Sequence, residues 1–148
     1  MKALKNTDIY LGYLGLIPFI FFTICLSLSY KHTFIFGNTL QALTSYSLII
    51  ASFIAGSHWG RQVNIETLTN RVLLQIGSNI NVIAIWIAYL CLSPKTIIAV
   101  MIIEFVVLLK FDFFIYKQKL ISYKYLFCIR VPITIFVVSL LAISWSMI

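Results

Sequence analysis

Five long apolar stretches make up most of this 148-residue sequence, over residues 9–29, 39–60, 73–92, 96–116 and 131–146. A helix needs roughly 20 mostly apolar residues to cross a hydrocarbon core of about 30 Å. Backbone polar groups in lipid must be satisfied within helices or closed barrels. The pattern therefore predicts an all-α membrane protein, a bundle of five transmembrane helices. The connections are short, so residues 1–148 are expected to form one integral membrane domain.

The composition supports the same class. Hydrophobic residues make up 61% of the chain and charged residues 10%, whereas soluble domains carry about 45–50% and 25%. Such a chain could not keep its surface in water without aggregating. A soluble enzyme, a disordered tail and a secreted disulfide scaffold are therefore excluded.

The net charge of +7 is distributed unevenly between the two predicted ends. Lys31 and Lys95 fall at one end. Eight basic residues fall at the other end: Lys2, Lys5, Arg61, Arg71, Lys117, Lys119, Lys124 and Arg130. Basic loops stay in the cytoplasm, which predicts an N-terminus inside and a C-terminus outside. We therefore expect the partners to be the lipid bilayer, other membrane proteins or a second copy of this chain, and no nucleic acid.

Ionisable residues inside a membrane are costly, so each is a candidate for a functional role. Several helices place polar groups at one depth near the inner interface: His58, Gln75, Asn79, Asp112 and Arg130. Lipid offers them no partner, so we expect them to face one another. Two interpretations stay open. The cluster is either an interhelical packing clamp or a pocket for protons, a quinone or another polar ligand.

Glu104 lies apart from this cluster, close to the predicted middle of the membrane. It is either a protonated acid that is hydrogen-bonded to a neighbouring helix, or part of a proton relay or ion site.

Small residues follow one face of the second stretch, at Ser52, Gly56 and Gly60. Small residues allow helices to approach closely in lipid, so this face is expected to pack tightly against another helix. In the first stretch, Pro18 is expected to kink the helix unless a neighbour compensates for its missing hydrogen bond.

No motif for catalysis, a cofactor or a metal is present. Cys25, Cys91 and Cys128 are isolated, and none belongs to a C-x-x-C or Cys/His pair with ligand spacing. No phosphate-binding loop, nucleophile elbow or pair of catalytic carboxylates occurs. We therefore expect no catalytic residues, no metal and no cofactor.

The sequence resembles one known family, the domain-of-unknown-function 3429 family. The resemblance is carried by residues in all five stretches: Tyr13, Gly15, Ile17, Pro18, Phe19, Phe53, Gly56, His58, Trp59, Gly60, Ser78, Trp86, Asp112, Arg130, Pro132 and Thr134. This chain has Asn81 where relatives tend to have a proline, and Cys128 where they often have a second basic residue. The family consists of short multi-pass proteins of proteobacteria, with relatives described only as a mitochondrial transmembrane protein. The resemblance implies a bacterial inner-membrane location and supplies no reaction.

Two functions are compatible with these observations. The first is a non-enzymatic accessory or assembly component of a membrane complex. The alternative is a small carrier or redox-linked protein with a polar inner-leaflet pocket around His58, Asp112 and Arg130.

Overall fold

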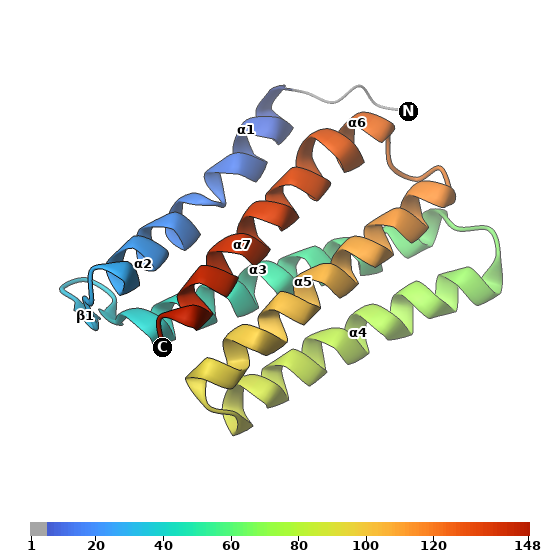
Figure 1. The fold of residues 1–148 in the computed structure, drawn as a ribbon. Helices are drawn as coiled ribbons and strands as arrows, with labels where there is room; N and C mark the ends of the chain where they lie inside the picture. Colours follow the sequence, from blue (N-terminus) through green and yellow to red (C-terminus); the bar gives the residue numbers. More distant parts are fainter. Residues whose placement is uncertain (1–5) are drawn as a thin grey trace.

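The computed structural model describes residues 6–148, and over this range the chain forms five long helical segments (Figure 1). The predicted all-α fold is confirmed. Lys2 and Lys5, which contribute to the predicted charge bias, lie outside the described residues.

The first segment is interrupted in its middle. It consists of α1 (Asn6–Leu14) and α2 (Ile17–Ser27), with Pro18 in the first turn of α2. Pro18 has no N–H to donate to the carbonyl of Leu14, so the first helix ends there. The hydroxyl of Tyr46 donates to the nearby Gly15 carbonyl at 3.0 Å. A neighbouring helix thus satisfies backbone that the break exposes.

A small hairpin joins the first segment to the second. Strands β1 (His32–Thr33) and β2 (Gly37–Asn38) pair antiparallel. Helix α3 (Thr39–Arg61) follows directly, because the Asn38 side chain caps it by accepting from the Gln41 amide at 3.0 Å. A 3-10 turn, η1 (Gln62–Asn64), then leads to the next segment.

The next two helices form an antiparallel pair, α4 (Leu68–Cys91) and α5 (Pro94–Lys117). The Ser93 hydroxyl accepts from the Thr96 amide at 3.4 Å, and Pro94 lies at the start of α5, where its missing N–H has no cost.

The last segment starts earlier than predicted. It contains α6 (Tyr123–Tyr125), a π-helical turn η2 (Leu126–Arg130) and α7 (Val131–Ser146), with helical backbone throughout. The predicted stretch of 131–146 coincides with α7, which has Pro132 in its first turn, but helical backbone already begins at Tyr123. The π turn ends directly before α7, so this proline lies inside a continuous helical segment.

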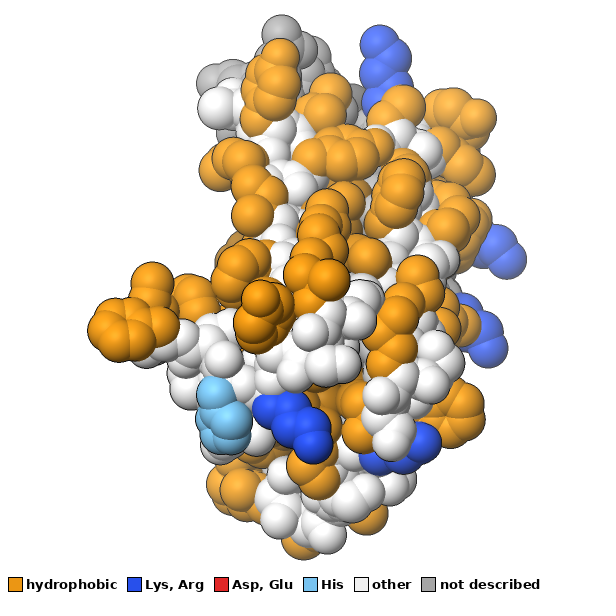
Figure 2. Space-filling view, turned by 60° about the vertical axis from the view of Figure 1, so that its left-hand side comes forward, with side chains coloured by type: hydrophobic (Ala, Val, Ile, Leu, Met, Phe, Trp, Pro, Cys, Tyr) orange, Lys and Arg blue, Asp and Glu red, His pale blue; other side chains and the backbone are white. Residues whose placement is uncertain are grey.

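Within the described residues, four segments are long and apolar enough to cross a membrane: Ile9–Ser27, Thr39–Asn64, Leu68–Cys91 and Tyr123–Ser146. Helix α5 is not among them because it carries Glu104, Lys110 and Asp112. Hydrophobic side chains cover most of the face in Figure 2, and its basic side chains lie toward the lower end and the margins.

Helices α3 and α5 form the centre of the bundle. Helix α5 packs against α3, α7 and α4, while α2 packs against α3 and α7. Figure 1 shows α1 and α2 on one side of the bundle and α4 on the opposite side. The core between them is built from large buried side chains, among them Phe19, Leu43, Met101, Leu108 and Leu141.

The helix directions bring six described basic residues to the end that carries α6 and the start of α1 (Figure 1). These are Arg61, Arg71, Lys117, Lys119, Lys124 and Arg130. Lys31 and Lys95 lie at the opposite end, where Lys95 is 5.3 Å from the ring of Trp145 near the C-terminus.

Candidate functional site

Three side chains from three segments meet near the basic end of the bundle. His58 comes from α3, Asp112 from α5 and Arg130 from η2. His58 Nε2 is 3.0 Å from Asp112 Oδ1, and Arg130 Nε donates to Asp112 Oδ2 at 2.6 Å. Each carboxylate oxygen therefore has its own partner. We call His58, Asp112 and Arg130 the polar cluster.

The polar cluster is shielded from the surroundings of the bundle. Asp112 is 0% exposed, His58 1% and Arg130 7%. A buried charge needs a partner because desolvation of an isolated ion costs several kcal/mol. The carboxylate of Asp112 and the guanidinium of Arg130 supply that partner to each other. The cluster therefore ties α3 and α5 to the last helix.

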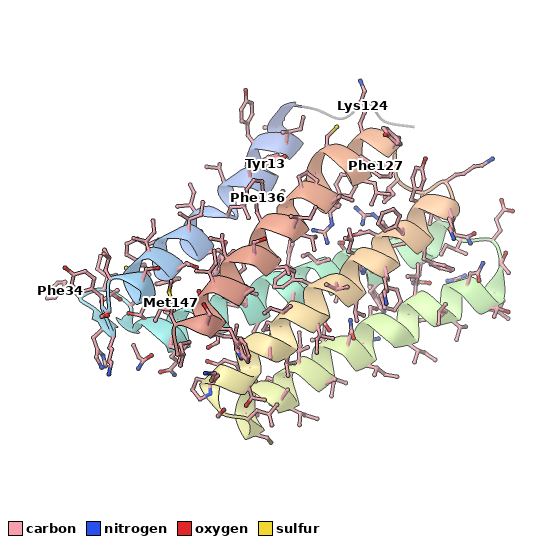
Figure 3. All side chains as sticks on the ribbon, in the orientation of Figure 1. Tyr13, Phe34, Lys124, Phe127, Phe136 and Met147 are labelled. Atoms are coloured by element: carbon pink, nitrogen blue, oxygen red, sulfur yellow. The ribbon has the colours of Figure 1, made fainter. Side chains whose placement is uncertain are left out.

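A compensated proline helps to position Arg130. Pro132 has no N–H to donate to the carbonyl of Cys128, four residues earlier. The hydroxyl of Tyr13 on α1 donates to this carbonyl at 3.0 Å, and Figure 3 shows Tyr13 beside the start of the last helix. Gly12 permits this approach, since a Cβ there would lie 3.0 Å from side-chain atoms of Ile129 and Ile133.

Arg130 also lines a cavity of about 730 Å³. Its Nη2 atom is buried and has no hydrogen-bond partner among the described residues. The cavity lies between α1–α2, α3 and the last helix, and most of its lining is apolar. Its apolar walls include Leu11, Phe19, Ile50, Ile54, Ile133 and Val137.

A second guanidinium, that of Arg61, lines the same cavity. Arg61 is half-buried at the end of α3. Its Nη1 donates to the Ser57 hydroxyl at 3.3 Å, and its Cζ lies 5.3 Å from the ring centroid of Tyr125, within cation–π range. The basic end of the cavity thus holds two arginines, while the remainder is apolar.

Gln75 and Asn79 do not join the polar cluster, so the expectation that they face it was wrong. Both are exposed on α4, and Asn79 Nδ2 donates to the Gln75 carbonyl at 3.0 Å. The buried face of α4 carries Leu74, Ser78 and Ile85 instead. A step of one residue turns a side chain by about 100°, which moves Gln75 and Asn79 away from the interior.

Glu104 forms a separate contact between α4 and α5. It is 6% exposed, and Asn81 Nδ2 donates to its Oε1 at 2.8 Å. The acid thus has a hydrogen-bond donor on a neighbouring helix, where the alternative would be an unsatisfied polar group in an apolar interior.

The small-residue face of α3 does not pack within this chain, contrary to expectation. Among the described residues, no atom lies within 4 Å of a Cβ placed on Gly56 or Gly60, and Ser52 is half-buried. Ala51 and Ala55, both fully buried, make the close packing from another face of α3. The sequence showed small residues on both faces and did not indicate which face is inside.

Two further polar contacts lie outside the set that the sequence singled out. Arg71 Nε donates to Gln62 Oε1 at 2.8 Å, and the hydroxyls of Thr23 and Ser144 are 3.1 Å apart. A buried glutamine after a helix end has no sequence signature. The described residues contain no group of three or more His, Cys, Asp or Glu side chains that could hold a metal ion.

Comparison with known proteins assigns the chain to a family. A family model described as protein of unknown function (DUF3429) matches residues 4–146. This chain belongs to the DUF3429 family. No curated protein and no solved structure matches it. The matched range includes every residue of the polar cluster and of the cavity in this DUF3429 protein.

Proposed function

We propose that this DUF3429 protein is a five-span integral protein of the bacterial inner membrane, with its N-terminus in the cytoplasm and its C-terminus outside. We propose further that it acts as a non-enzymatic accessory or assembly component of a membrane complex. The partners would be the bilayer and other membrane proteins or a second copy of the chain.

The packing of α5 supports five spans. Its 24 residues are about 36 Å long, enough to cross the hydrocarbon core. It lies among α3, α4 and α7, so its acidic residues Glu104 and Asp112 are not left to lipid. Asp112 is paired with Arg130, Glu104 accepts from Asn81, and exposed Lys110 lies close enough to the helix end to snorkel.

The distribution of basic residues supports the orientation. The end that collects Arg61, Arg71, Lys117, Lys119, Lys124 and Arg130 would face the cytoplasm, as short basic loops do. The end with the hairpin and the C-terminus would face outward.

The main support for a non-enzymatic role is the burial of the polar cluster. A general acid or base must come within hydrogen-bond reach of its substrate. His58 and Asp112 are 1% and 0% exposed, and their contacts are with each other and with Arg130. This supports a clamp that holds helices together, and leaves the outer faces of the bundle for partners.

Isolation of the protein at native abundance in a mild detergent tests the accessory role. The proposal expects migration as a complex larger than the chain, with a partner in fixed ratio. Leucines at Gly56 and Gly60 should release that partner without unfolding the chain, because both positions have open space around them. Leucine at exposed Ile80 of α4 is the matched control. Wild-type protein that migrates as a single chain with no partner contradicts the proposal.

The cavity favours a second candidate, a small carrier or redox-linked protein. Arg130 connects the polar cluster to an apolar space of ligand size, since small-molecule sites commonly measure about 300–1,000 Å³. This candidate predicts that organic extraction of the purified protein releases a small polar or redox-active molecule. It predicts further that His58→Ala reduces the amount released. Extraction of phospholipid alone contradicts it.

A further inference from the structure

We propose that the cavity between α1–α2, α3 and the last helix binds one anionic phospholipid of the inner leaflet. The phosphate would accept hydrogen bonds from Arg130 and Arg61, and an acyl chain would lie along the apolar walls. The choice of leaflet rests on the proposed orientation. The binding itself does not depend on the accessory role, and it competes with the carrier candidate for the same cavity.

The guanidinium of Arg130 has an unused hydrogen-bond donor among the described residues. Its side chain is 9% exposed, Nε is used by Asp112, and Nη2 has no partner in the part of the chain that is described. A buried donor without a partner costs about 1–3 kcal/mol, and more when the group is charged. Arg130 also lines the cavity, and Nε is its only side-chain donor with an acceptor within residues 6–148. An oxyanion at the basic end of the cavity would supply a further acceptor to this guanidinium, which binds phosphate oxygens well.

The charge of the lining fits a monoanion. The charges of Asp112 and Arg130 offset each other within the polar cluster. Arg61 adds one positive charge, and among the described side chains it bonds only the neutral hydroxyl of Ser57. One phosphodiester, with a single negative charge, would balance this lining.

The shape of the cavity fits a lipid within its own leaflet. The arginines lie at the basic end, and the apolar lining extends along α3 from Arg61 back to Ile50. These residues are eleven positions apart, or about 16 Å along the helix. Half of a hydrocarbon core of about 30 Å has the same depth. A headgroup at the arginines would therefore place its chain parallel to those of neighbouring lipids.

Native mass spectrometry of the delipidated protein tests the proposal. The probes are dioleoyl phosphatidylglycerol, dioleoyl phosphatidylcholine with the same chains, and glycerol phosphate, which has a phosphate group and no acyl chain. We expect one phosphatidylglycerol per chain, bound roughly tenfold more tightly than phosphatidylcholine. Both lipids carry the phosphodiester, but the choline cation would lie close to the two arginines and repel them. Glycerol phosphate should not bind. Equal affinity for the two lipids, or saturation by glycerol phosphate, overturns the proposal.

Variants locate the site. Arg130→Lys keeps a positive charge beside Asp112 and removes Nη2, so it should weaken phosphatidylglycerol binding. Because Arg130 also helps to hold the fold, half-buried Arg61→Gln is the second variant and should lower the affinity about tenfold. Lys124→Gln is the matched control, since Lys124 is exposed at the same end and does not line the cavity (Figure 3). Equal affinities of Arg61→Gln and Lys124→Gln overturn the proposal.

Discussion

Arg130 and Asp112 form a 2.6 Å ion pair that joins the last helix to α5 inside an apolar bundle. The same arginine borders the cavity, so one side chain connects the helix contacts to the space beside them. His58 adds a second bond to the carboxylate from α3. The stability of the bundle is therefore expected to depend most strongly on the acid at the centre.

Asp112→Asn should destabilise the protein by about 3–5 kcal/mol, because it leaves the buried guanidinium of Arg130 without a counter-charge. Unfolding in mixed micelles with increasing sodium dodecyl sulfate measures the change. Glu66→Gln is the control, since Glu66 is exposed and forms no ion pair within residues 6–148. Equal stability of the two variants would contradict the role of the ion pair.

His58→Leu should have a smaller effect, about 1–3 kcal/mol, measured by the same unfolding assay. The substitution removes one hydrogen bond to Asp112 but leaves the pair with Arg130 in place. The expected order is thus a larger loss for Asp112→Asn than for His58→Leu. The reverse order would mean that the histidine, and not the arginine, is the main partner of the acid.

The contact between Tyr13 and the Cys128 carbonyl is expected to depend on Pro132. Tyr13→Phe removes the hydrogen bond and should cost about 0.6–1 kcal/mol. In a Pro132→Ala background the restored N–H can satisfy the same carbonyl, so Tyr13→Phe should cost less there. A double-mutant cycle measures this coupling. Additive effects would show that the tyrosine does not compensate for the proline.

The sequence correctly predicted that His58, Asp112 and Arg130 lie at one depth of the bundle, where they are in contact. It did not predict the direction in which each polar side chain of that depth points. Gln75 and Asn79 share that depth as well, yet they point outward, because α4 packs at the edge of the bundle. Only packing against neighbours determines which face of an apolar helix is inside.

The details of the irregular backbone could not be predicted from the sequence either. Pro18 correctly indicated a disturbed first helix, but nothing identified Tyr46 as the side chain that bonds the Gly15 carbonyl. The predicted last stretch began at residue 131, whereas helical backbone already begins at Tyr123 and passes through a π turn. Both outcomes depend on residues far away in the sequence that supply the missing hydrogen bonds.

Two glycines should respond to substitution with opposite signs. Gly12→Leu should destabilise the protein by about 1–3 kcal/mol, because a side chain there meets Ile129 and Ile133. Gly56→Leu should be neutral or stabilising by up to about 1 kcal/mol, since the position is open and leucine favours helix. Detergent unfolding of the isolated chain compares them. A larger loss for Gly56→Leu would mean that its face is packed in the folded chain.

The side of the membrane on which each end of α5 lies is the most direct test of the five-span architecture. The charges of α5 leave its crossing undecided by composition, and its packing supports the crossing. Single cysteines would replace Ser93 or Lys119 in a chain without its own three cysteines. An impermeant maleimide would then be added to intact spheroplasts. The five-span architecture predicts labelling of Ser93→Cys in intact spheroplasts and of Lys119→Cys only after lysis. Labelling of both from the same side would contradict it.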